Sequence, residues 1–437
     1  MKSALKTPFA LLLVIISACL SACTGRPLLS TVGFNSPIPY ETPNQAESHQ
    51  LIFDTLWNEV NDNYLRQDFG GADWEQINRT YADRLTPNLT HNEFHQLLKE
   101  MVAEIPNSGI QLVTREERLD RSVSQTQGFS VVGPFVAIRD NPDEEPRLVV
   151  LHVVPGSPAA EAGLRPHDAI LGIDGKSIET GLGEEATKQF RGVDGSNIQL
   201  IVRSPQQEPR IVTITRQQFR SEPVELQSSI LPGTDILYVV FPPHEDRNIL
   251  NEFSAVLEQI QRLNSNSRGL IIDMRLMTGV QRSAVFQLMP LFADGDVAVR
   301  TGALTDSSEQ NPISISGVPS PLQNAGQLPL VLITSKETSG PAELFAAALQ
   351  DQGRATIIGQ KTAGSLQNFE PKFLQDGSQL LMPTSTIIMT NSQRDVGQLG
   401  VEPDILIDSS WDEFTSANDP AIDQAIRTIR DAPRSNR

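Results

Sequence analysis

The residues with the clearest capacity for chemistry lie in a short turn before an apolar, helix-like stretch. Residues 338–343 read Thr-Ser-Gly-Pro-Ala-Glu. A serine such as Ser339 can attack a carbonyl carbon if a neighbouring base takes its proton and backbone N–H groups stabilise the oxyanion. The N–H of Gly340 is the candidate oxyanion donor, and Lys361 is the nearest plausible base in the sequence.

The same turn is also a sound helix start that needs no chemistry. Gly340 can serve as the N-cap, and Pro341 suits the first helical position. Glu343 suits the first turn, where the helix dipole favours a carboxylate. The residues alone leave the catalytic and the structural interpretations open.

Metal and cofactor chemistry have little support in the sequence. We predict no metal site and no cofactor, because no histidine shows a defensible ligand spacing with Asp or Glu among His91, His95, His152, His167 and His244. The chain has two cysteines, Cys19 and Cys23, and both lie near its start. The remainder therefore cannot form a disulfide or use a thiol nucleophile.

The first residues are typical of a secretory signal. Lys2 and Lys6 precede the short apolar run 9–20, and the sequence Leu-Ser-Ala-Cys at 20–23 resembles a bacterial lipobox. An ordinary signal peptide with a chance cysteine is the alternative. The lipobox predicts a signal peptide over 1–22, lipidation of Cys23 and a lipid-anchored, extracytoplasmic protein of the bacterial cell envelope.

The chain is strongly acidic, with 53 Asp and Glu against 35 Lys and Arg. No basic stripe interleaved with aromatic residues is present, so nucleic acid is excluded as an expected partner. The sequence does not indicate an oligomeric state.

Changes in hydrophobic pattern divide the chain into segments. Residues 23–48 are polar and rich in Pro, which predicts a tether. Residues 49–120 show helical spacing and a capping box at Thr90 and Glu93. Short strand-like runs and Gly/Pro turns fill 124–219, strands and helices alternate over 222–410, and 411–437 is expected to be a C-terminal tail.

The middle segment resembles a PDZ domain of bacterial proteases. Residues 154–175 read Val-Pro-Gly-Ser-Pro-Ala-Ala-Glu-Ala-Gly-Leu-Arg-Pro-His-Asp-Ala-Ile-Leu-Gly-Ile-Asp-Gly. Such domains bind the C-terminal tail of another protein as an added β-strand and hold its carboxylate with backbone N–H groups. The resemblance places this peptide site at Gly133, Phe135 and Val136, although Pro134 removes one donor. A PDZ fold that serves only as a packing module is the alternative.

The last segment resembles the core of the S41 family of C-terminal processing, or tail-specific, proteases. The matching stretches are 270–275 (Leu-Ile-Ile-Asp-Met-Arg), the helix-like 343–351, the strand and turn 353–364, and 400–404 (Gly-Val-Glu-Pro-Asp). With the other segments, the resemblance implies a multidomain α+β protein. It has an N-terminal helical domain, a β-rich PDZ domain and a layered α/β core of the crotonase/ClpP-like type.

Active members of this family use a Ser nucleophile and a neutral Lys as base. Their positions correspond to Gly340 and Ser365 in this chain, and the residue after the nucleophile is Pro341, which has no N–H for the oxyanion. The family's Gly-Gly, another oxyanion element, is reduced to Gly279. The resemblance therefore implies a catalytically degenerate member.

Three functions follow as hypotheses. The first is a non-catalytic, membrane-anchored protein that binds C-terminal peptide tails of exported or envelope proteins. The second is an active serine endopeptidase with Ser339 as a displaced nucleophile. The third is a partner subunit that regulates an active relative.

Overall fold

Helices open the described part of the chain in the computed structural model. The structure describes residues 45–106, 108–118, 132–139, 145–179, 187–217, 226–241, 249–263, 268–277, 286–302, 311–317, 328–408 and 418–432. The predicted signal peptide and lipidation site at Cys23, and Gly279, lie outside these residues. Helix α1 begins at Gln45, so the last four residues of the segment predicted as a tether are helical.

Three helices form a layer, as the sequence predicted. They are α1 (Gln45–Asn63), α2 (Trp74–Ala82) and α3 (His91–Ala103), with the short turn η1 (Phe69–Gly71) between the first two. Thr90 and Glu93 make the predicted capping box, in which each side chain accepts a hydrogen bond from the other residue's backbone N–H.

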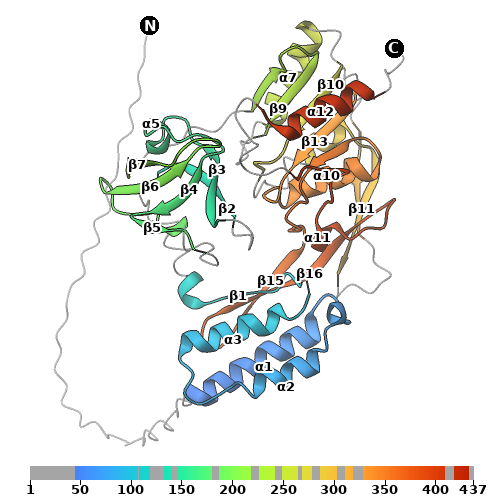
Figure 1. The fold of residues 1–437 in the computed structure, drawn as a ribbon. Helices are drawn as coiled ribbons and strands as arrows, with labels where there is room; N and C mark the ends of the chain where they lie inside the picture. The colour runs from blue at the N-terminus through green and yellow to red at the C-terminus, as the bar shows by residue number, and fades with distance from the viewer. Residues whose placement is uncertain are drawn as a thin grey trace, which may run out of the picture. The chain divides into compact units, whose positions relative to one another are not determined.

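The helical layer packs on an antiparallel sheet. Its path is β1 (Gln111–Val113), β16 (Gln379–Met389), β11 (Gly295–Gly302) and β12 (Asn311–Ile315), and β15 (Asn368–Phe373) also pairs with β16. Phe94 of α3 shares one hydrophobic core with Leu380 and Met382 of β16. The β15–β16 hairpin therefore carries the helices on one surface (Figure 1).

The PDZ segment forms its own sheet and its own core. Its path is β2 (Pro134–Arg139), β3 (Arg147–Val153), β4 (Ala169–Ile173), β6 (Asn197–Arg203) and β7 (Arg210–Thr215), and β5 (Lys176–Ser177) pairs with β4. The short helix α5 (Pro158–Glu161) is capped by Ser157. Strand β2 pairs only with β3 among the described strands, so it is an edge strand.

A second sheet of the core is mainly parallel and belongs to the layered α/β arrangement that the alternation of strands and helices predicted. Its path is β17 (Ile405–Leu406), β14 (Thr356–Gly359), β13 (Leu330–Thr334), β10 (Gly269–Asp273), β9 (Ile236–Val240) and β8 (Gln227–Ile230), with β8 antiparallel. Helices α7 (Ile249–Leu263) and α10 (Pro341–Asp351) contribute to the core on one face. Both faces are covered, so β10 and β13 are buried throughout.

Part of the segment predicted as a C-terminal tail is a helix. Helix α12 (Pro420–Asp431) packs on the other face of the parallel sheet, where Ala421, Ala425 and Ile429 share a core with the sheet. Asp419 caps its first turn by accepting hydrogen bonds from two backbone N–H groups. The helix buries only a narrow stripe of small and aliphatic residues, which is a weak signal in sequence.

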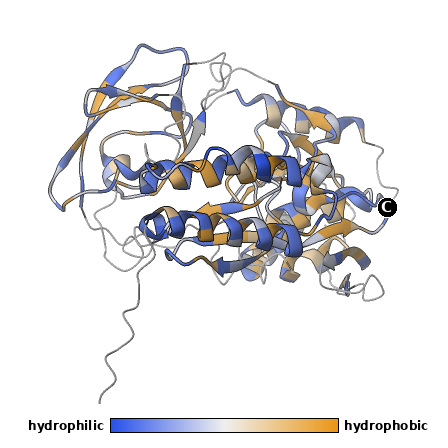
Figure 2. Ribbon diagram, turned by 90° about the horizontal axis from the view of Figure 1, so that it is seen from below, coloured by the Kyte–Doolittle hydropathy of each residue, from blue (hydrophilic) through white to orange (hydrophobic). Residues whose placement is uncertain are grey.

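Hydropathy follows this arrangement. The outward faces of the helices are largely hydrophilic, and hydrophobic strands lie behind them (Figure 2). None of the helices in the described part of the chain combines the length and the apolar character that crossing a bilayer requires.

Candidate functional site

The turn that joins β13 to α10 is fixed to the end of the neighbouring strand β10. The hydroxyl of Thr338 donates to the carbonyl of Met274 at 3.0 Å, and the hydroxyl of Ser335 donates to the carbonyl of Arg275 at 3.0 Å. The backbone N–H of Ser339 donates to the carbonyl of Met277 at 3.1 Å. Because parallel strands end at the same edge of a sheet, this turn lies where α/β proteins commonly build sites.

Gly340 occupies a backbone conformation that favours glycine. Its φ is +61° and its ψ is −133°. A Cβ atom at this position would meet no other atom within 4 Å, so space does not exclude a side chain. The positive φ would nevertheless strain any L-residue placed here.

Glu343 is the centre of the hydrogen-bond network that holds this region, and its carboxylate is fully buried. One oxygen, Oε1, accepts from the Thr362 hydroxyl at 2.5 Å and from the Gly364 N–H at 2.6 Å. The other, Oε2, accepts from the Gly340 N–H at 2.9 Å and from both the N–H and the hydroxyl of Ser365 at 2.8 and 2.9 Å. These five donors replace water around a buried carboxylate, which would otherwise be costly to bury.

The predicted oxyanion donor is therefore already engaged. The N–H of Gly340 donates to Glu343 and also to the hydroxyl oxygen of Ser365, at 2.8 Å. An oxyanion hole needs donors that are aimed at the developing charge and are not used elsewhere. The sequence identifies Glu343 only as a first-turn residue, because its partners at 362–365 are some 20 positions away.

The candidate base residues are also engaged elsewhere. Ser365, which the sequence resemblance aligned with the family's base, has a hydroxyl that accepts from the Gly340 N–H and donates to Glu343. Lys361 has a side chain 48% exposed, and its ammonium pairs with Glu402 at 2.5 Å. The structure thus brings Gly340, Ser365 and Glu343 together, and it holds Lys361 on the surface.

A buried charge cluster lies at the end of β10. Asp273 accepts from the guanidinium of Arg275 at 2.6 and 3.0 Å and from the Tyr238 hydroxyl at 2.6 Å. Arg275 also pairs with Asp419, the cap of α12, at 2.7 Å. Burial raises the pKa of Asp273, but the attraction of Arg275 and these hydrogen bonds outweigh it and bring the pKa below its ordinary value.

The predicted peptide site lies at the edge of the PDZ sheet. Gly133 has a φ of +96° and precedes β2, whose residues include Phe135 and Val136. The carbonyl of Gly133 accepts from the Val154 N–H at 3.1 Å, which fixes the strand start. His167 has a φ of +71° at the position where the PDZ signature ordinarily has glycine.

Comparison with known families matches three consecutive parts of the chain. Residues 45–103 match the tricorn protease C1 domain, residues 119–203 match the PDZ domain, and residues 235–407 match peptidase family S41. These matches cover the helical layer, the β2–β6 part of the PDZ sheet and the parallel sheet. The predicted fold class, with a helical region, a PDZ domain and an α/β core, is confirmed.

Similar proteins carry related names. The carboxyl-terminal-processing protease of Synechocystis sp. is 30% identical over 381 residues, which are 86% of this chain and 84% of the relative. The chloroplastic carboxyl-terminal-processing peptidase 2 of Arabidopsis thaliana is 29% identical over 368 residues, covering 81% of this chain and 68% of the relative.

Solved structures show the same fold. The photosystem II D1 C-terminal processing protease matches with a TM-score of 0.56 and 23% identity, over 83% of this chain and 93% of that one. Mature CPAF in complex with lactacystin matches with a TM-score of 0.56 and 13% identity, over 89% of this chain and 99% of that one.

Proposed function

The chain belongs to peptidase family S41, and from this premise we propose that it is a non-catalytic member that binds the C-terminal tails of exported or envelope proteins. Its position in the cell follows from the lipobox: Cys23 is lipidated and holds the protein at a membrane, outside the cytoplasm. The PDZ domain supplies the tail-binding site.

The observation that carries this proposal is the hydrogen bonding around Gly340. The position of the family nucleophile has no side chain, and its N–H donates to Glu343 and Ser365. Ser365 stands where the family has its basic lysine, and a hydroxyl cannot act as the proton acceptor that a neutral amine provides. The nucleophile and the base are therefore both replaced, and the candidate oxyanion donor is engaged.

Tail binding has support from the edge of the PDZ sheet. A peptide can add to β2 as a further antiparallel or parallel strand, because β2 has one side without a partner among the described strands. The backbone around Gly133 adopts a left-handed conformation just before this strand. A glycine in this conformation lets the chain turn sharply into the strand, although Pro134, which follows it, offers no N–H to a carboxylate.

We expect the purified protein to leave an unfolded substrate with an apolar C-terminus intact. The Ser339→Ala variant should behave identically, because Ser339 is not expected to attack the substrate. The measurement is the appearance of cleaved fragments over time, with an active S41 relative beside it to show that the substrate is cleavable. Cleavage by the wild type that is lost in Ser339→Ala would show instead that the chain is an endopeptidase with a relocated nucleophile.

Tail binding can be tested by changing the peptide and not the protein, so the protein fold is the same in every measurement. We expect a peptide with a free, apolar C-terminus to bind, and its C-terminal amide to bind at least about tenfold more weakly, since charge-assisted hydrogen bonds to the carboxylate are lost. In an added strand, only every second N–H group of the peptide points toward β2. N-methylation should therefore weaken binding at those residues and have little effect at the residues between them. Equal affinity of acid and amide, measured by fluorescence anisotropy, would argue for a PDZ domain that only packs.

A further inference from the structure

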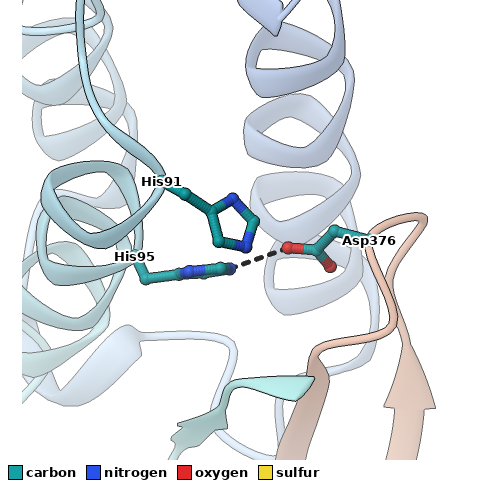
Figure 3. Close-up of side chains that lie close together, drawn as sticks. All are labelled: His91, His95 and Asp376. Carbon is teal, nitrogen blue, oxygen red and sulfur yellow. Dashed lines mark hydrogen bonds and ion pairs between the residues drawn. The ribbon is translucent and has the colours of Figure 1, made fainter. Parts of the chain in front are cut away.

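A cluster of two imidazoles and a carboxylate lies between the helical layer and the β15–β16 turn. His91 and His95 come from α3, and Asp376 comes from the turn. One ligand atom from each residue lies within 4.8 Å of the other two. Figure 3 shows both rings and the carboxylate directed toward a common point.

The spacing on the helix explains how two histidines reach one point. Residues four apart lie on the same face of a helix, one turn above the other, so His91 and His95 project to the same side. Asp376 lies 281 positions away from His95 in the sequence, and its Oδ2 is 2.7 Å from the Nε2 of that ring. Two imidazole nitrogens with one carboxylate oxygen are a donor set that suits zinc and neighbouring divalent transition metals.

The carboxylate is oriented by its other oxygen. Oδ1 of Asp376 accepts from the N–H of Ser378 at 2.9 Å and from its hydroxyl at 2.6 Å. These bonds leave Oδ2 facing the histidines. Hydrogen bonds that hold a ligand group from behind are a usual feature of metal sites.

An ion pair alone would explain only part of this arrangement. His95 is 4% exposed and its bond to Asp376 would join α3 to the hairpin without any metal. His91 is exposed, makes no hydrogen bond through its ring within the described part of the chain, and has its ring centroid 4.1 Å from that of His95 in an edge-on contact. A second imidazole held against the first adds nothing to an ion pair, but it completes a set of three ligands.

A third imidazole lies beside the cluster. His49 of α1 is 4% exposed, stacks on Phe94 with centroids 4.0 Å apart, and has its centroid 6.4 Å from that of His91. Its buried Nδ1 has no hydrogen-bond partner among the residues that the structure describes. His49 is not one of the three proposed ligands, and its ring packs against Phe94 at the side of the cluster.

We propose that His91, His95 and Asp376 bind a divalent transition metal ion of the zinc class. Ligand atoms around such an ion are about 3.3 Å apart in tetrahedral geometry, so the present positions need only small side-chain rotations. The exposed side next to His91 leaves a fourth position for water. The ion would clamp α3 to the tip of the β15–β16 hairpin, whose other end begins at Asn368, roughly 20 Å along the strand.

The test is a titration of the full chain after treatment with a chelator and removal of any affinity tag. We expect one equivalent of Zn²⁺ to bind by calorimetry and to raise the Tm. Bound Co²⁺ should show the visible absorption of a low-coordinate ion. This spectrum detects occupancy of the site without an enzymatic assay.

The decisive variant is His91→Gln. It should leave the Tm of the metal-free protein nearly unchanged, since the His95–Asp376 bond remains, and weaken Zn²⁺ binding at least about tenfold. His152→Gln, on β3 of the PDZ sheet, is the control and should keep the full affinity. No binding by the wild type, or equal Zn²⁺ affinity of wild type and His91→Gln, would overturn the proposal. Asp376→Asn is a second variant, expected to lose the Co²⁺ spectrum.

Discussion

Replacement of Glu343 by Ala is expected to lower the free energy of unfolding by about 3–4 kcal/mol, because several buried donors lose their acceptor at once. The carboxylate accepts from the Thr362 hydroxyl and from the N–H groups of Gly340, Gly364 and Ser365. It also lies in the first turn of α10, where the helix dipole favours a negative charge. Chemical denaturation, followed by circular dichroism, measures the loss.

The control is Glu402→Ala in the same region. Glu402 is 62% exposed and pairs with Lys361, so its removal should cost less than about 1 kcal/mol. Glu343→Gln should give an intermediate loss, because the amide keeps one acceptor oxygen but directs an NH₂ group at existing donors. If Glu343→Ala and Glu402→Ala were equally mild, water would be replacing the carboxylate, and the region would be less tightly held than its hydrogen bonds indicate.

This network also bears on how a catalytic site could be rebuilt. The substitution Gly340→Ser would place a side chain on a left-handed backbone that favours glycine. The substitution Ser365→Lys would introduce an amine in place of a hydroxyl that now bonds to Glu343. Both changes act on the same network, so each alters the stability of the turn as well as its chemistry. A rebuilt site would therefore be less stable than the present one.

Local signals explain which parts of the fold could be predicted from the sequence. The capping box at Thr90 and Glu93 and the helix start at Gly340 and Pro341 depend on residues within one turn, and both are present. The apolar residues at the start of the 270–275 stretch lie in β10, and they fit a parallel strand that is covered on both faces. Family motifs then indicated the order of the domains.

Contacts between distant residues explain what could not be predicted. The expectation of no metal site rests on ligand spacing along the chain, whereas the metal site that we propose at His91 and His95 depends on a carboxylate that is distant in the sequence. Asp376 joins them only through the packing of α3 on the hairpin. Helix α12 is hidden for a similar reason, since its buried stripe gains meaning only against the sheet.

Replacement of Asp273 by Ala is expected to cost about 3–5 kcal/mol, because it leaves the Arg275 guanidinium, whose side chain is only 21% exposed, without its main partner. Asp273 is 3% exposed and accepts from both Arg275 and Tyr238. Arg275 in turn pairs with Asp419 at the start of α12. The variant should therefore loosen the end of β10 and the attachment of α12 together, which hydrogen exchange would detect as lost protection in both.

The pH dependence separates the charge of Asp273 from its packing. Its pKa in the folded protein lies below the ordinary value, so the unfolded chain binds the proton more readily. The carboxylate's contribution to stability is then fully present above about pH 4, the pKa of an unfolded Asp, and is lost as the pH falls toward the lower folded pKa. We expect the difference in unfolding free energy between wild type and Asp273→Asn to shrink over that range.

An exposed pair provides the comparison for this effect. Glu100 and Arg84 are 40% and 47% exposed in their side chains, so Glu100→Ala should change the unfolding free energy far less than Asp273→Ala does, because solvent screens the pair. A difference between wild type and Asp273→Asn that stayed constant down to low pH would mean that shape and hydrogen bonding, rather than charge, account for the loss. Arg275 bridges Asp273 and Asp419. If charge accounts for the loss, protonation of Asp273 should therefore weaken both the end of β10, beside the Gly340 turn, and the attachment of α12 on the other face of the sheet.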